Sequence, residues 1–154
     1  MKEKSTIPLL PEQPDILRAR QSWRYNGEIR PDFAEPTQAG QESVWDYPRP
    51  PRLEESEDQI RVVFGGLTIA ESCRTKRVLE TSHPPVYYIP PGDILAGTLV
   101  PTARQSICEW KGVARYFHVM AGEFSTENAA WAYEMTTPAF AGLKDYVAFY
   151  AHLM

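Results

Sequence analysis

The stretch Arg77-Val-Leu-Glu-Thr-Ser-His-Pro-Pro-Val-Tyr-Tyr-Ile-Pro-Pro91 indicates the class of fold. Its β-branched and aromatic residues favour strands, and its prolines exclude a helix because each one fixes φ and removes a backbone donor. We therefore expect two short strands, residues 77–82 and 86–89, on either side of a rigid corner at Ser82-His83-Pro84-Pro85. Because side chains alternate along a strand, Arg77 and Glu80 should point to opposite faces.

Further strands are predicted on both sides of this stretch. Residues 60–71 contain two β-rich runs joined by Gly65-Gly66, and a tight hairpin turn needs positive φ at both of its central positions. Residues 106–120 predict two strands joined at Lys111-Gly112, and residues 129–135 predict another. Thr137-Pro138 has the form of a helix start, and apolar residues then recur every three or four positions as far as Tyr150. This pattern predicts a C-terminal helix or helical turn.

Length and composition indicate one domain with one core. The chain has 154 residues, of which 43% are apolar and 23% charged, and its fourteen prolines favour turns and short strands over long helices. Residues 1–41 are polar and dotted with prolines, so we expect an extended N-terminal arm with a short helix near residues 14–23, followed by a single domain of residues 42–154. The predicted fold is mainly β, with two small antiparallel sheets and the C-terminal helix.

Charge and hydropathy argue against several classes of partner. The net charge of −4 offers no basic footprint for duplex nucleic acid. No apolar run has the length of a signal-peptide core or of a spanning helix, so we expect a cytoplasmic protein with no membrane partner. Cys73 and Cys108 are expected to be reduced thiols, and two cysteines without close spacing do not make a structural zinc site. We accordingly expect no metal and no cofactor, and the oligomeric state stays open.

Six motifs together resemble the domain-of-unknown-function family 427. They are Glu42-Ser-Val-Trp-Asp-Tyr-Pro-Arg-Pro-Pro, Val62-Val-Phe-Gly-Gly, Arg77-Val-Leu-Glu-Thr-Ser-His-Pro-Pro, Tyr87-Tyr-Ile-Pro-Pro, Cys108-Glu-Trp-Lys-Gly-Val-Ala and Pro138-Ala-Phe-Ala-Gly-Leu-Lys-Asp-Tyr-Val-Ala-Phe-Tyr. The resemblance covers roughly residues 30–150 and implies a β-tent fold, in which two antiparallel sheets lean together, as in methionine sulfoxide reductase B and the drug-binding domain of cereblon.

Three expectations qualify this resemblance. The structural zinc common in β-tent proteins sits on cysteine pairs, which this chain lacks, so zinc is not carried over. The nucleotidyltransferase-like label of the family implies metal-holding carboxylates after a Gly-Ser pair, and no such motif is present. Glu109 stands where the family's usual Cys-Pro-Trp-Lys-Gly motif has proline, which adds a backbone donor and a charge at this turn.

The candidate ligand site combines aromatic and polar side chains around one hollow between the sheets. Flat aromatic faces stack on a planar ring with little loss of entropy, and a guanidinium binds carboxylate or phosphate through two hydrogen bonds. The candidates are Arg77, Glu80, Ser82, His83, Tyr87, Tyr88, Trp110, Lys111 and Tyr116. The alternatives are that the aromatic residues are ordinary core and that Arg77 forms a structural salt bridge with Glu80.

Two residues are candidates for catalysis. His83 is the histidine of the rigid corner and a candidate general base, with an ordinary pKa near 6.5, and its alternative role is a hydrogen bond to the adjacent turn. Cys108 is a candidate nucleophile activated by Lys111, and its alternative role is that of a small buried apolar residue.

Three classes of function therefore remain open. The first is a small-molecule-binding module for a nucleotide or nucleoside-like ligand. The second is an enzyme that is nucleotidyltransferase-like or acts through His83 or Cys108. The third is a protein-interaction domain that uses the proline-rich arm.

Overall fold

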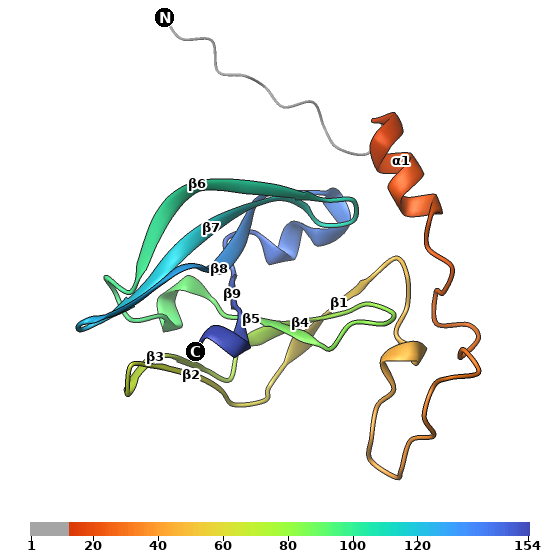
Figure 1. The fold of residues 1–154 in the computed structure, drawn as a ribbon, viewed down its shortest axis with the longest axis horizontal. Coiled ribbons are helices and arrows are strands. Elements are labelled where there is room, and N and C mark those ends of the chain that lie inside the picture. Colours follow the sequence, from red (N-terminus) through yellow and green to blue (C-terminus); the bar gives the residue numbers. More distant parts are fainter. Residues whose placement is uncertain (1–12) are drawn as a thin grey trace, which may run out of the picture.

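The computed structural model describes residues 13–154, which form mainly antiparallel strands (Figure 1). A three-stranded sheet has the order β1-β4-β5, and a four-stranded sheet has the order β6-β7-β8-β9. The strands of the first are β1 (Arg52–Ser56), β4 (Thr75–Leu79) and β5 (Val86–Tyr88). Those of the second are β6 (Leu99–Cys108), β7 (Gly112–Ala121), β8 (Phe124–Thr136) and β9 (Val147–Phe149).

The predicted hairpin is confirmed and forms a sheet of its own. It consists of β2 (Ile60–Phe64) and β3 (Leu67–Ser72), and the turn residues Gly65 and Gly66 have φ values of 58° and 78°. The expectation of two sheets was therefore too low, since residues 13–154 contain this hairpin as a third. Its strands pair with each other rather than extending the three-stranded sheet.

The two larger sheets join along one edge and enclose the main core. The amide of Ile89 donates to the carbonyl of Val147 at 2.8 Å, and the amide of Val147 donates back at 2.9 Å, so the chain after β5 lies beside β9. Away from this edge, buried side chains fill the space between the sheets: Val78, Tyr88, Ala114, Tyr116, Tyr133, Phe140, Leu143 and Ala148. In Figure 1 the four-stranded sheet lies above the three-stranded one.

The prediction of a C-terminal helix is wrong. Residues Pro138–Leu143 form a 3₁₀ helix (η4), and the chain ends in β9 and a second 3₁₀ turn, η5 (Ala151–Leu153). Phe140 and Leu143 do point into the core at helical spacing, but Asp145 has a φ of 64°, which is incompatible with a continuing right-handed helix. Val147 then pairs with Ala132 of β8. The regular spacing of apolar residues therefore comes from two short elements, η4 and β9, which both contribute side chains to the core.

The α-helix of the described chain lies near the other end, at α1 (Pro14–Gln21), close to the predicted short helix. Its buried Ile16 packs on Val113 of β7, and the chain then runs along the right-hand side of Figure 1 without regular structure until η2 (Val44–Asp46). The predicted division at residue 41 stays a prediction, and residues 1–12 of the predicted arm lie outside the described residues.

Candidate functional site

Strand alternation separates the predicted site residues into two groups. Arg77 and Tyr87 are paired across β4 and β5, on the face of the sheet opposite to buried Val78 and Tyr88. The prediction that Arg77 pairs with Glu80 is wrong, because its guanidinium instead contacts Glu42 at 2.9 Å and Glu54 at 2.6 Å. The hydrogen bonds that Arg77 donates to Glu42 and then to Glu54 raise the pKa of Arg77 above its ordinary value, against the lowering effect of burial. Arg77 is therefore part of a structural ion-pair network.

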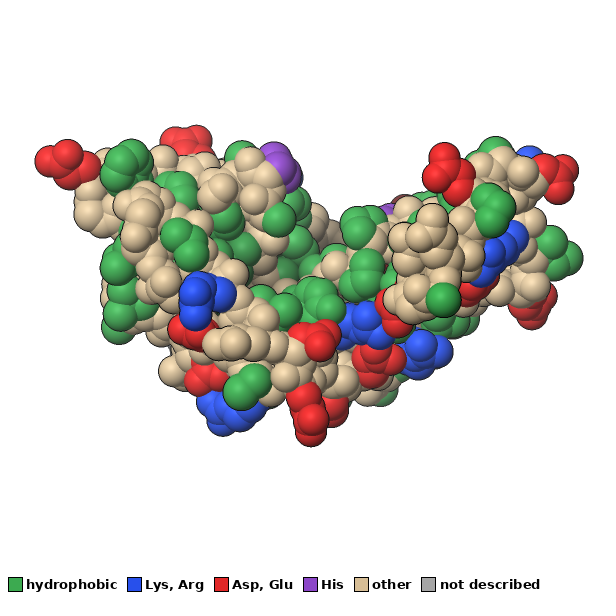
Figure 2. Space-filling model, turned by 90° about the horizontal axis from the view of Figure 1, so that it is seen from below, with side chains coloured by type: hydrophobic (Ala, Val, Ile, Leu, Met, Phe, Trp, Pro, Cys, Tyr) green, Lys and Arg blue, Asp and Glu red, His purple; other side chains and the backbone are tan. Residues whose placement is uncertain are grey.

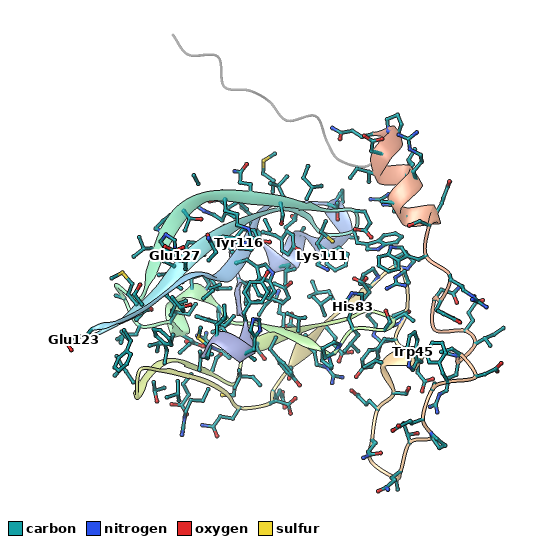
Figure 3. The ribbon with its side chains drawn as sticks, viewed as in Figure 1. Trp45, His83, Lys111, Tyr116, Glu123 and Glu127 are labelled. Atoms are coloured by element: carbon teal, nitrogen blue, oxygen red, sulfur yellow. The ribbon has the colours of Figure 1, made fainter. Side chains whose placement is uncertain are left out.

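Glu80 lies at the centre of a second charge cluster, on the inner side of the corner. Its carboxylate is 3.1 Å from Nη2 of Arg49, 3.6 Å from Nζ of Lys111 and 3.6 Å from Nδ1 of His83, and its side chain is only 12% exposed. We call these four residues the Glu80 cluster. Figure 3 shows Lys111 and His83 approaching this point from the β6–β7 turn and from the β4–β5 corner. The cluster thus ties the two larger sheets together.

His83 and Ser82 serve the geometry of the corner. Nδ1 of His83 lies 2.9 Å from the carbonyl of Thr81, and because a carbonyl only accepts, this nitrogen is the donor. The side chain of His83 is partly exposed, and its ring meets that of Trp23 edge-on at a centroid distance of 6.2 Å. Ser82 has a φ of 68°, and its amide donates to the carbonyl of Val44 at 2.9 Å.

Tyr88 and Tyr116 are core residues rather than walls of an open cage. Tyr88 is fully buried, its hydroxyl accepts a 3.3 Å hydrogen bond from Nε1 of Trp131, and burial raises its pKa well above the ordinary value. The hydroxyl of Tyr116 lies 2.9 Å from that of Ser106. Tyr116 is the cross-strand partner of Trp131, and neither tyrosine lines the cavity described below, so both rings belong to the interior.

Cys108 is separated from its predicted activator. It packs against the core, and the thiol contributes, after burial and Tyr88, to raising the pKa of Tyr133. Nζ of Lys111 is directed toward Glu80 and lies 6.0 Å from the ring centroid of Tyr133. Within residues 13–154, no hydrogen bond links Cys108 to Lys111 or His83, so this arrangement does not present an assembled nucleophile and base.

A cavity of about 450 Å³ lies beside the corner prolines, between β5, the hairpin and the end of β9. Its walls are mostly apolar: Ile60, Arg61, Val62, Val63, Pro84, Pro85, Val86, Tyr87, Ile89, Trp131, Phe149, Tyr150, Ala151 and Met154. The rings of Trp131 and Tyr150 lie 4.5 Å apart and form its aromatic wall. Figure 2 shows a hollowed face with hydrophobic side chains gathered in the hollow.

Of the predicted ligand-binding residues, only Tyr87 lines this cavity. Trp131 lies in a predicted strand, two residues before Tyr133. Side chains two residues apart point to the same face of a strand, and this alternation indicates that Trp131 points inward with Tyr133. The sequence pattern extends the predicted C-terminal helix to Tyr150, so it gives no indication that Tyr150 lines a cavity. The cavity therefore shares residues 84–87 with the central stretch, whereas its other aromatic residues, Trp131, Phe149 and Tyr150, come from β8 and the C-terminal segment.

The arm closes the outer side of the Glu80 cluster. Nε of Arg20 donates to the carbonyl of Glu109 at 2.8 Å, and Nε1 of Trp23 donates to its carboxylate at 2.8 Å. The ring of Trp23 lies 3.9 Å from the guanidinium of Arg49, whose side chain is only 3% exposed. Trp110 is also covered, with the Arg20 guanidinium 5.2 Å from its ring. Glu109, the departure from the family motif, is therefore one of the residues that anchor the arm.

Replacing Glu109 by alanine should loosen the arm without unfolding the domain. The hydrogen bond from Trp23 to the Glu109 carboxylate stabilises the docked arm by about 1 kcal/mol. Its loss should therefore raise the population of molecules with an undocked arm roughly fivefold. The rate of tryptic cleavage after Arg20 and Arg24 measures that population. Glu123→Ala at the far β7–β8 turn is the matched control (Figure 3). Equal cleavage rates in both variants would show that Glu109 does not anchor the arm.

The fold and this interior define an antiparallel β protein with an aromatic cavity next to a sheet-linking charge cluster. The chain belongs to the family described as a domain of unknown function, DUF427, whose model matches residues 52–154. The resemblance seen in the sequence is thus confirmed for the domain, whereas the motif at residues 42–51 precedes the matched range. Comparison with curated proteins gives no match.

Residues 13–154 lack two further kinds of feature. None of the helices in this range has the length and apolar character needed to cross a membrane. The same range contains no group of three or more histidine, cysteine, aspartate or glutamate side chains placed to hold a metal ion.

Proposed function

We propose that the protein binds a small molecule with a planar, mostly apolar ring, of nucleoside-like size, in the cavity beside Trp131. The observation that carries this proposal is the aromatic wall: Trp131 and Tyr150 stand together at a cavity of about 450 Å³, within the usual size range of ligand sites. Pro84 and Pro85 face this wall from the rigid corner. A wall built of prolines and rings changes little on binding, so little affinity is lost to ordering.

The charged residues of the cavity favour a ring over a purely ionic ligand. Arg61 is the charged residue among those that line it, and its guanidinium is occupied by Glu71 at 2.9 Å. The hydroxyl of Tyr87 donates to Asp58 at 3.1 Å. The polar groups at the rim are thus already paired, and burial of apolar surface is left as the main source of affinity.

The relation to the β-tent class is part of the same proposal. A β-tent has two sheets that are joined along one edge, as these sheets are at Ile89 and Val147. The class includes a ligand-binding domain, the drug-binding domain of cereblon. We infer the class from this joint and from the family resemblance.

Thermal unfolding in the presence of nucleosides, nucleotides and small cyclic amides tests the proposal. A ligand at one hundred times its Kd should stabilise the protein by about 2.7 kcal/mol. Val63→Trp should remove this shift, because Val63 lines the cavity and its partly exposed side chain allows a larger residue to fill the space. Leu67→Trp is the matched control, since Leu67 is similarly exposed on the same hairpin and does not line the cavity.

Comparison with Leu67→Trp distinguishes a loss of binding in the cavity from a general effect of the added tryptophan. A shift that is lost with Val63→Trp and kept with Leu67→Trp supports a ligand in the cavity. No shift with any member of the panel, or an equal shift in both variants, counts against it.

The two other classes of function stay predictions. An enzyme that uses His83 or Cys108 requires turnover that His83→Ala or Cys108→Ser removes while the protein stays folded. A protein-interaction role requires a partner that is lost when residues 1–41 are deleted.

A further inference from the structure

We propose that Arg104 binds an anionic group, a carboxylate or a phosphate, carried by the ring ligand of the cavity. This inference deepens the proposed function and rests on it, since it names the chemical class of the ligand. It depends on one arginine whose guanidinium has no acidic partner among the described residues.

Arg104 differs from most arginines of the chain. Within residues 13–154, eight other arginines pair with a carboxylate. Arg20 donates to a carbonyl, whereas Arg24 and Arg104 each lie over a tyrosine ring instead. The guanidinium carbon of Arg104 is 4.4 Å from the ring centroid of Tyr116. A guanidinium held by a ring face keeps its planar fork of donors free for a bidentate partner.

An irregularity of β6 places Arg104 there. The pairing of β6 with β7 shifts register between Pro101 and Gln105, and the amide of Arg104 donates to the hydroxyl of Thr102 at 3.2 Å inside this bulge. Bulges of this kind redirect side chains and are common next to functional sites. The result is that Arg104 covers Tyr116, a ring on the inner face of the four-stranded sheet.

Two neighbouring rings connect Arg104 to the cavity. Arg104 lies over the ring of Tyr116, and Tyr116 is the cross-strand partner of Trp131, which lines the cavity. The hydroxyl of Tyr116 lies 2.9 Å from that of Ser106. The ring of Tyr150 continues the wall, tilted against Trp131 at a centroid distance of 4.5 Å. A ring beside Trp131 would therefore have hydroxyl groups and a cation on the side of Tyr116.

The chemistry of these groups selects a class of ligand. Hydroxyls and a free guanidinium stabilise oxygen anions, and an Arg–carboxylate or Arg–phosphate pair is among the stronger hydrogen-bonded contacts. A planar ring that carries one carboxylate or one phosphate satisfies both the apolar cavity and Arg104. A neutral ring satisfies only the cavity.

Two pairs of probes test this inference and distinguish the two anions. Indole and indole-3-acetate form the carboxylate pair, and adenosine and adenosine 5′-monophosphate form the phosphate pair, with affinities measured by calorimetric titration. In at least one pair the anionic member should bind about tenfold or more tightly than the neutral member, as expected for a charge-assisted contact. Arg104→Gln should abolish that preference, and Arg104→Lys should restore part of it.

Arg24→Gln is the matched control, because Arg24 also lies over a tyrosine, at 5.2 Å from the Tyr25 ring, and does not line the cavity. It should leave the preference intact. A second measurement reports on Arg104 directly: its Nε–Hε resonance, assigned by loss of the signal in Arg104→Gln, should shift on titration with inorganic phosphate or benzoate.

Failure of this inference differs from failure of the proposed function. Suppose that neutral rings bind and lose their binding in Val63→Trp, while Arg104→Gln keeps the preference for the anionic probe. That result would support the cavity proposal and overturn the role of Arg104. If no probe binds and the Arg104 resonance does not move, both are overturned.

Discussion

Replacing Glu80 by alanine should lower the free energy of unfolding by about 3 kcal/mol, the magnitude typical of breaking a buried ion pair by removing one partner. The carboxylate holds Arg49 and Lys111 together, and the Arg49 side chain is only 3% exposed. Without Glu80 that guanidinium stays buried with only carbonyl acceptors, those of Tyr25 and Thr81. Urea unfolding followed by tryptophan fluorescence measures the change.

A surface ion pair supplies the comparison. Glu55 lies 3.4 Å from Lys76 with its side chain 78% exposed, so Glu55→Ala should cost at most about 1 kcal/mol. Adding Lys111→Met to Glu80→Ala should recover part of the loss, because one of the unpaired charges is then removed as well. If the cost of Glu80→Ala were no larger than that of Glu55→Ala, the cluster would not hold the sheets together.

Replacing Gly112 by alanine should destabilise the fold by about 3 kcal/mol or more, from backbone strain and overlap combined. Gly112 has a φ of 127°, and an added Cβ would overlap the carbonyl oxygen of Met135 on β8. Since that oxygen is backbone, the clash is relieved only by moving a strand. The turn before Gly112 carries Lys111, so displacement should also separate this lysine from Glu80.

Two other glycines separate the cost of backbone strain from the cost of steric overlap. Gly66 has a φ of 78° and open space at its Cβ position, so Gly66→Ala should show the strain alone, about 1 to 2 kcal/mol. Gly92 has open space and no unusual φ, so Gly92→Ala should be close to neutral. Chemical unfolding of all three variants gives the comparison, and a Gly112→Ala cost equal to that of Gly66→Ala would exclude the predicted overlap.

Local patterns predicted the elements whose causes are local. The Gly65-Gly66 turn, the corner at Pro84-Pro85 and the Lys111-Gly112 bend each follow from backbone restrictions of a few residues. The prediction of a C-terminal helix was wrong because its cause is not local. The spacing from Phe140 to Tyr150 combined two elements that meet only in the folded core, and periodicity does not report where one element ends and another begins.

The candidate site was predicted less well than the strands. Alternation already set Arg77 and Glu80 on opposite faces, and the structure shows their partners to be Glu42 and Glu54 for the first and Arg49 and Lys111 for the second. Those partners come from distant segments, so no spacing within the central stretch identifies them.

The amino-acid sequence alone indicated the family through its motifs. It also determined the antiparallel strands and the rigid corner, because prolines, glycines and side-chain alternation act over a few bonds. Only the tertiary structure decided which aromatic residues line a cavity, which arginines lack an acidic partner among residues 13–154 and what Glu109 contacts. These properties depend on distances between strands far apart in the chain, and such distances are set when the sheets pack.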